Sequence, residues 1–225
     1  MKRTIAAIGS QNPFDLELGC FGTLAKLSKR GYEVYLVIAQ DNSNTHNSIP
    51  VENGGNNISV LLESIQRLSK KIGAHVSFAD GFNYSDMSQN NVNVLGAFIR
   101  RINPALVFIP FRESLNPSQR VLAESAFLAC REIKNVLFYE TDINSKFLPS
   151  IYSLIQDQEI SLKKSCILEC RHDGNQDQIQ DILNKMNSMH ANYAKMTHSD
   201  RKLFEAFASH RLLLLSSTSG EDIIA

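Results

Sequence analysis

The sequence predicts a single α/β domain: a three-layer, Rossmann-like, mostly parallel sheet with helices on both faces and a C-terminal helical extension. Two observations predict this class. Short apolar runs alternate with amphipathic segments up to about residue 140, as in chains that build parallel sheets. Runs such as Glu33–Ala39 are apolar on both faces, which is typical of a buried parallel strand. Because parallel strands need crossover connections, the intervening helices are expected to cover both faces of the sheet.

The expected elements follow one another in a regular order. Thr4–Ile8 is a β run that closes on Gly9, and Leu18–Arg30 is expected to be a helix that ends at Gly31. The polar stretch 41–57, with Pro50 and two adjacent glycines, is expected to be a loop. Apolar periodicity predicts helices over 58–72, 92–102 and 118–134, and strands over 33–39, 76–78, 105–109 and 135–139.

The pattern changes beyond Thr141. No repeat, linker or composition shift divides the chain, so 1–215 is interpreted as one domain, with a strand and helical extension at 141–215 and a flexible tail at 216–225. Within the extension we expect a strand at 150–155 and mostly helical segments at 159–170, 177–195 and 202–211.

Charge and cysteine content exclude several classes of protein. The 225 residues carry 23 basic and 23 acidic side chains, so the formal net charge is zero. This balance removes the long-range attraction on which non-specific nucleic-acid and anionic-membrane binding depend. No run approaches the roughly 18 apolar residues of a membrane-spanning helix, and the first apolar stretch is too short for a secretory signal. Four cysteines favour reduced, buried thiols. We therefore expect a cytoplasmic protein without nucleic-acid or membrane partners.

Ligands of open α/β sheets bind at the carboxyl ends of the strands. The loops 9–19, 40–57 and 110–119 are therefore the candidate binding loops. A dinucleotide site is not expected, because no Gly-x-Gly-x-x-Gly follows the first strand and Gly19-Cys-Phe-Gly22 comes too late.

Two of these loops carry segments that resemble a known family. The first segment is Asn12-Pro13-Phe14-Asp15-Leu16-Glu17-Leu18-Gly19-Cys20-Phe21-Gly22-Thr23, and the second is Asn116-Pro117-Ser118-Gln119-Arg120; Phe204-Glu205-Ala206-Phe207 adds support. With these segments in this order, the chain resembles the LmbE-like (PIG-L) family of zinc-dependent sugar N-deacetylases. The resemblance spans nearly the whole chain.

The resemblance implies where the family's chemistry would lie. In a His-Pro-Asp-Asp motif, the His and the second Asp bind zinc, while the first Asp is the general base. The last His of a His-x-x-His motif completes the ligand set. Such a zinc ion keeps an open position for a water whose pKa falls to about 7. The carboxylate then takes a proton from this water as it attacks an amide carbonyl.

This sequence departs from both motifs. This chain has one extra residue before the first motif, so either Asn12 or Gln11 takes the place of the ligand His, depending on where the alignment gap is put. Phe14 takes the place of the general base. Asn116 and Gln119 replace the two histidines of the second motif. A neutral amide is a poor ligand for zinc, and a phenylalanine cannot accept a proton. We therefore expect no catalytic residue, no zinc cofactor and a degenerate member of the family, a pseudoenzyme.

Asp15 alone is retained among the family's ligands. It is interpreted as a vestigial ligand or, preferably, as a residue that caps the following helix or bonds the pocket amides. Arg112 and Glu113 could grip a sugar hydroxyl or a phosphate, or form a surface ion pair worth under about 1 kcal/mol. A sugar or nucleotide-sugar would suit the hydrogen-bonding groups of this pocket. The predicted pocket residues are Asn12, Asp15, Arg112, Glu113, Asn116 and Gln119.

A different metal site is less favoured. Cys166, Cys170 and His172 supply at most three ligands at a loose spacing, and packed thiols beside a surface histidine are the favoured interpretation. His46 and His75 are isolated. His190, His198 and His210 lie in the extension, at spacings that form no i, i+4 pair.

Three functional hypotheses remain open. The first is an inactive LmbE-like protein that keeps a carbohydrate-sized cleft for binding or for a structural or regulatory role. The alternative is an active N-deacetylase-type hydrolase that acts on N-acetylglucosamine-like sugar conjugates through a rearranged metal site. In the third, the fold serves assembly only, as a homo-oligomer, with which a neutral net charge is compatible.

Overall fold

The computed structural model describes residues 3–10, 14–41, 57–141, 146–169, 176–199 and 202–211, and the statements below concern these ranges. In chain order, the elements are β1 (Thr4–Gly9), α1 (Asp15–Gly19), α2 (Phe21–Lys29), β2 (Glu33–Gln40), α3 (Asn57–Ile72), β3 (His75–Asp80), α4 (Gln89–Ile102), β4 (Leu106–Pro110), α5 (Pro117–Ala129), β5 (Val136–Tyr139), β6 (Ile151–Ile155), α6 (Asp157–Glu169), α7 (Gln176–Met196) and β7 (Leu203–Arg211).

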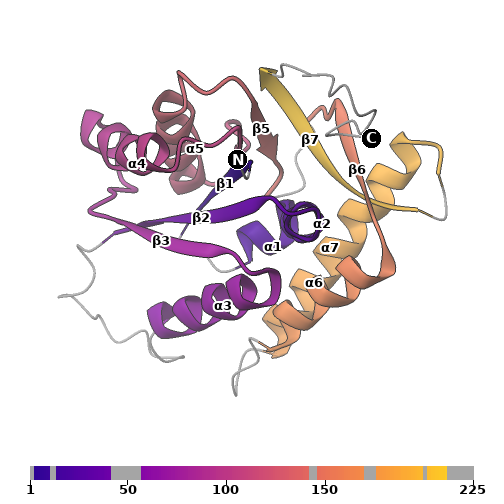
Figure 1. Cartoon of the computed structure of the whole chain (residues 1–225). Helices are drawn as coiled ribbons and strands as arrows, with labels where there is room; N and C mark the ends of the chain where they lie inside the picture. Colours follow the sequence, from indigo (N-terminus) through magenta and orange to yellow (C-terminus); the bar gives the residue numbers. More distant parts are fainter. Residues whose placement is uncertain are drawn as a thin grey trace.

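The strands form one sheet in the order β3-β2-β1-β4-β5-β7-β6. The first five strands in that order are parallel, and β7 lies antiparallel between β5 and β6 (Figure 1). Chain order therefore reverses between β1 and β4, which is where open α/β sheets bind their ligands. The predicted fold class is confirmed.

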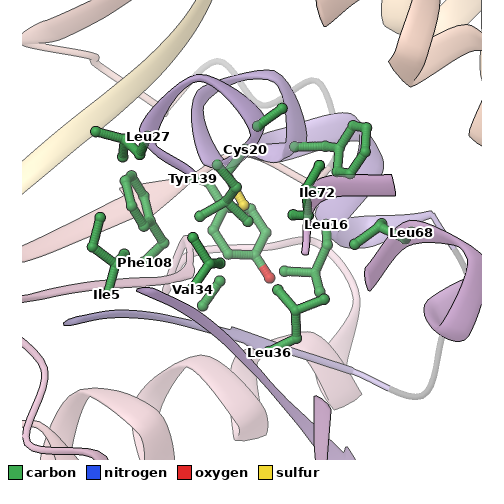
Figure 2. Close-up of a cluster of buried hydrophobic side chains, with 14 of the residues drawn as sticks. Ile5, Leu16, Cys20, Leu27, Val34, Leu36, Leu68, Ile72, Phe108 and Tyr139 are labelled. Atoms are coloured by element: carbon green, nitrogen blue, oxygen red, sulfur yellow. The ribbon is translucent and has the colours of Figure 1, made fainter. Parts of the chain in front are cut away.

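Each face of the sheet has its own core, because successive strand residues point to opposite sides. On one face, Ala7, Leu36 and Phe108 pack with residues of α1, α2, α3 and α6. Figure 2 shows part of this cluster, with the ring of Tyr139 at its centre. On the other face, strand residues such as Val37 pack with α4 and α5. The result is the expected three layers (Figure 1).

The helix expected over 18–30 is two helices, α1 and α2, which meet at Cys20. The Tyr139 ring packs so closely on α1 that a Cβ atom on Gly19 would overlap Tyr139 Cδ2. The hydroxyl of Tyr139 donates a hydrogen bond of 2.7 Å to the Ile8 carbonyl, which fixes the ring against β1. A residue that is distant in sequence therefore packs against the end of α1, next to the break.

Gly19→Ala is expected to lower the free energy of unfolding by about 2–3 kcal/mol, because the added methyl group overlaps the Tyr139 ring. Urea unfolding measures this loss. The matched control is Gly96→Ala within α4, where the nearest atoms belong to the flexible end of Arg100. This control should be neutral or slightly stabilising. Equal effects of the two substitutions would contradict the packing argument.

The segment 202–211 was expected to be helical, and this expectation is wrong. Leu203–Arg211 is the strand β7, paired on both sides. Its side chains alternate with the period of a strand: Phe204 and Ala206 join one core, and Phe207 joins the other. The hydrogen-bonding edges of β5 and β6, which are distant in sequence, determine the structure of this segment.

The extension otherwise holds the expected strand β6 and the two helices α6 and α7 (Figure 1). Within the described ranges, no helix is both long and apolar enough to cross a bilayer. The tail expected at 216–225 lies outside the described residues.

Candidate functional site

Asp15 lies beside the carboxyl end of β1, as the first residue of α1, and only 5% of it is exposed. Its Oδ2 atom accepts hydrogen bonds from the hydroxyl of Ser10 and from the side-chain amide of Gln119. Gln119 Nε2 also donates to Ser10 Oγ over 3.1 Å. A residue directly after β1 and residues of α1 and α5 therefore meet in one buried group, the Ser10–Asp15–Gln119 site. The sequence predicted Asp15 and Gln119 for this pocket, but missed Ser10.

The hydrogen bonds of this site fix the orientation of the Gln119 amide. A flip would place its oxygen against the Asp15 carboxylate, so Nε2 faces Asp15 and Ser10 and uses both its protons. Gln119 Oε1 is then buried, without a hydrogen-bond partner in the described part of the chain. An unpaired buried carbonyl of this kind costs about 1–3 kcal/mol. The site thus offers one unused acceptor.

The residues of this site do not fit a zinc ion. They supply one carboxylate from Asp15, one hydroxyl from Ser10 and the side-chain amide of Gln119. The amide nitrogen, which faces the carboxylate, is not a zinc ligand. No group of three or more His, Cys, Asp or Glu side chains suited to a metal occurs within the described ranges. Asn12, the remaining motif position, lies outside them.

Phe14 occupies the position at which the family resemblance implies a general base. Its φ angle of 78° is in the left-handed region, which a bulky residue rarely adopts. The side chain is buried in a cluster that joins α1 to α6 and α7 and contains Leu18, Ile167, Ile179 and Met186. Phe14 therefore anchors the start of α1 and has no proton-transfer chemistry.

Asn116 is exposed at the N-terminus of α5. Its Oδ1 atom accepts a 2.9 Å hydrogen bond from the backbone N–H of Ser118. Asparagine at this position is a strong helix cap, so the local backbone uses its side chain. Asn116 is not part of the buried site that Asp15 and Gln119 form.

Arg112 and Glu113 do not pair with each other. Arg112 forms a two-pronged ion pair with Glu124 of α5, at 2.9 and 2.8 Å, and its guanidinium lies 4.3 Å from the centre of the Phe127 ring. Glu113 pairs with Lys146 at 3.2 Å. These contacts hold the loop after β4 against its neighbours.

The cysteine pattern finds no support as a metal site. Cys166 of α6 is buried in the core between that helix and the sheet. Cys170 and His172 lie outside the described residues.

A second buried polar group, which the sequence did not indicate, surrounds Glu205 of β7. Its carboxylate accepts hydrogen bonds from the backbone N–H groups of Gly22 and Thr23, at 2.8 and 2.7 Å, and from Lys163 Nζ at 3.0 Å. Lys163 also donates to the Leu18 carbonyl at 2.8 Å. The buried ion pair therefore holds the end of α1 and the positive N-terminus of α2 together. Glu205 is thus a strand residue that anchors the start of α2.

The buried phenols of Tyr139 and Tyr193 remain protonated near neutral pH. Burial, followed by the charges of Cys20 and Asp15, raises the pKa of Tyr139 well above its ordinary value. Burial and the Glu140 carboxylate, which accepts the hydroxyl hydrogen of Tyr193, raise the pKa of Tyr193 as well. Neither phenol can serve as a general base near neutral pH.

His190 of α7 is a buried, neutral imidazole. Its Nδ1 lies 2.7 Å from the Phe204 carbonyl, so this nitrogen carries the hydrogen, and Nε2 has no hydrogen-bond partner among the described residues. Burial, followed by the charge of Lys163, lowers the pKa of His190 to about 4.

The free energy of unfolding is expected to fall as the pH drops from about 6.5 towards 4. In this window the unfolded chain protonates His190 but the folded chain does not, so stability is fully present above the unfolded pKa. The expected loss is up to about 3 kcal/mol. Urea unfolding at pH 7, 6 and 5 measures it, and His190→Gln should flatten the slope. An unchanged slope in this variant would refute the assignment to His190.

Comparisons with known proteins agree with this structure. No family model matches the chain. The uncharacterized deacetylase YaiS of Escherichia coli K12 is 25% identical over 173 residues, which cover 74% of this chain and 89% of that protein.

Solved structures show the same fold at low identity. The N,N'-diacetylchitobiose deacetylase from Pyrococcus horikoshii has a TM-score of 0.74 at 16% identity, covering 92% of this chain and 83% of its own. GalB from Pseudomonas putida KT2440, a 4-carboxy-2-hydroxymuconate hydratase, has a TM-score of 0.72 at 14% identity, covering 96% and 99%. The chain therefore has the fold of this deacetylase and of this hydratase, and most of its length is similar to a protein named as a deacetylase.

Proposed function

We propose that this protein is an LmbE/PIG-L-like protein that lacks zinc-dependent N-deacetylase activity and uses its site to bind a carbohydrate. The observation that carries the proposal is the Asp15 carboxylate, which accepts hydrogen bonds from Ser10 and Gln119. Both donors are neutral groups, and their hydrogen bonds hold the carboxylate within the site. Phe14 removes the proton acceptor that amide hydrolysis needs.

A neutral, hydroxyl-rich ligand fits the remaining chemistry of the site. The unused Gln119 Oε1 can accept a hydrogen bond from a ligand hydroxyl or amide N–H, whereas a ligand carboxylate or phosphate would be repelled by Asp15. The N,N'-diacetylchitobiose deacetylase of the same fold is named for a sugar substrate, which supports a saccharide as the ligand of this site. A hydratase has the same fold, so the fold alone does not determine the reaction.

The alternative is an active N-deacetylase-type hydrolase that acts on N-acetylglucosamine-like conjugates through a rearranged metal site. The deacetylase name of the Escherichia coli relative and the retained Asp15 favour it. For this alternative, residues outside the described ranges would have to complete the ligand set.

Saccharide titration and an acetate-release assay separate the two functions. We expect N,N'-diacetylchitobiose to bind the wild type saturably, and Gln119→Leu to weaken this binding by about tenfold, because the variant loses a buried hydrogen bond. The control Glu113→Gln, which changes only an exposed side chain, should bind as the wild type does. No acetate should be released, with or without added Zn²⁺. Zinc-dependent release that Asp15→Ala abolishes would establish the alternative; absence of saccharide binding would refute the binding role.

A further inference from the structure

A small cavity lies between α2 and the sheet, apart from the Ser10–Asp15–Gln119 site. Its volume is about 30 Å³, and none of its lining residues belongs to that site. The walls are mostly buried apolar side chains of α2 and of the strands β4 to β7, namely Leu27, Leu106, Phe108, Leu137, Ile151 and Phe207. Since one water needs about 10–15 Å³ of such space, the cavity accepts a group of only a few atoms.

Two polar side chains of α2 face this cavity. Thr23 and Lys26 lie three residues apart in the helix, so they occupy one face, next to Leu27. Thr23 is 6% exposed, and its hydroxyl has no hydrogen-bond partner in the described part of the chain. Buried hydroxyl groups are rarely left unpaired, so a polar group beside Thr23 in the cavity would supply the missing partner.

Lys26 supplies a positive charge at the partly exposed side of the cavity. Its Nζ atom donates to two neutral acceptors of β6, Ser153 Oγ at 3.3 Å and the Leu154 carbonyl at 3.4 Å. No carboxylate of the described residues lies within ion-pair distance of Lys26. Burial, followed by the charge of Arg30, lowers the pKa of Lys26 from its ordinary value, and the charges of Glu159 and Glu205 offset this only in part. The ammonium is therefore incompletely compensated, and an anion beside it would be stabilised.

We propose that this cavity is a second small-molecule site, which binds a short-chain monocarboxylate. One carboxylate oxygen accepts from Lys26 Nζ and the other from Thr23 Oγ1, while the one or two carbons of the chain contact Phe108, Leu137 and the other apolar walls. The volume excludes a sugar or a nucleotide. Both a charged donor and a hydroxyl donor favour an anion over a neutral alcohol or an amine.

Titration with sodium acetate and sodium propionate, followed by amide and methyl NMR shifts, tests the proposal. We expect saturable shifts confined to α2, β6 and the cavity methyl groups, with a dissociation constant on the order of millimolar, as suits so small a ligand. Methylammonium chloride and ethanol at the same concentrations should give no saturable shifts there.

Three variants test which residues bind the acetate. Lys26→Met and Thr23→Val should each weaken acetate binding by about tenfold, since each removes one donor to the carboxylate. Thr23→Val should not unfold the protein; by removing an unpaired hydroxyl it should raise the urea midpoint of the ligand-free form. Lys29→Met, on the same helix but paired with Glu159 outside the cavity, is the matched control and should bind acetate as the wild type does.

Either of two results would overturn the proposal: no saturable shift up to about 100 mM acetate, well above the millimolar range expected for so small a ligand, or equal acetate affinity in the wild type, Lys26→Met and Thr23→Val. Shifts centred on Asp15 instead would place acetate in the other site and equally refute the cavity assignment. Because no residue is shared with the saccharide site, failure here leaves the saccharide titration unaffected.

Discussion

Glu205→Ala is expected to lower the free energy of unfolding by about 3–5 kcal/mol. The substitution leaves the Lys163 ammonium buried, with 1% of its side chain exposed, and without its counter-charge. It also removes the acceptor for the backbone N–H groups of Gly22 and Thr23 at the start of α2. Urea unfolding at pH 7 measures the loss.

Two controls identify the cause of that loss. Glu113→Ala breaks an ion pair with Lys146 whose side chains are 58% and 70% exposed, and it should cost under about 1 kcal/mol. The double variant Lys163→Met/Glu205→Leu should recover the part of the loss that comes from the uncompensated Lys163 charge, because apolar side chains of similar size replace both buried charges. A loss for Glu205→Ala as small as that for Glu113→Ala would contradict the anchoring role of the buried pair.

Phe14→Ala is expected to cost about 3 kcal/mol. The substitution empties the centre of the cluster that joins α1 to α6 and α7, where Phe14 meets Leu18, Ile167 and Met186. Alanine remains unfavourable at the left-handed backbone angle, so little strain is relieved in compensation. Urea unfolding of the wild type and the variant checks the value.

The control for Phe14 is a second apolar truncation that creates no cavity. Leu115 is 74% exposed, and Leu115→Ala should change the free energy of unfolding by no more than about 0.5 kcal/mol. If Phe14→Ala costs no more than Leu115→Ala, then Phe14 does not anchor α1, and its position in the motif needs another explanation.

Most of the fold could be predicted because its signals are local. The apolar strands and the amphipathic helices have periodicities that can be read from neighbouring residues. The close packing of Gly19 beside the break at Cys20 could not be predicted, since Tyr139 approaches it from the other half of the chain. The strand β7 was missed for the same reason: its partners lie in β5 and β6.

The candidate site, too, was predicted only where the signal is local. Asp15 and Gln119 could be placed in one pocket because a family resemblance aligned two motifs, each at the end of a strand. The contribution of Ser10, and the orientation it helps to give the Gln119 amide, needed the structure. The contact of Glu205 with Gly22 joins residues 183 positions apart, and no local pattern indicates it.

Zinc binding by the purified protein tests the central claim most directly. Equilibrium dialysis against micromolar Zn²⁺ should leave the wild type without stoichiometric metal, because neutral donors occupy the Asp15 carboxylate. The variant Asn12→His/Gln119→His, which restores the two missing ligand residues of the family beside Asp15 and leaves the buried Phe14 in place, should gain about one zinc ion per chain. One tightly bound zinc ion per wild-type chain, lost in Asp15→Ala, would contradict the claim.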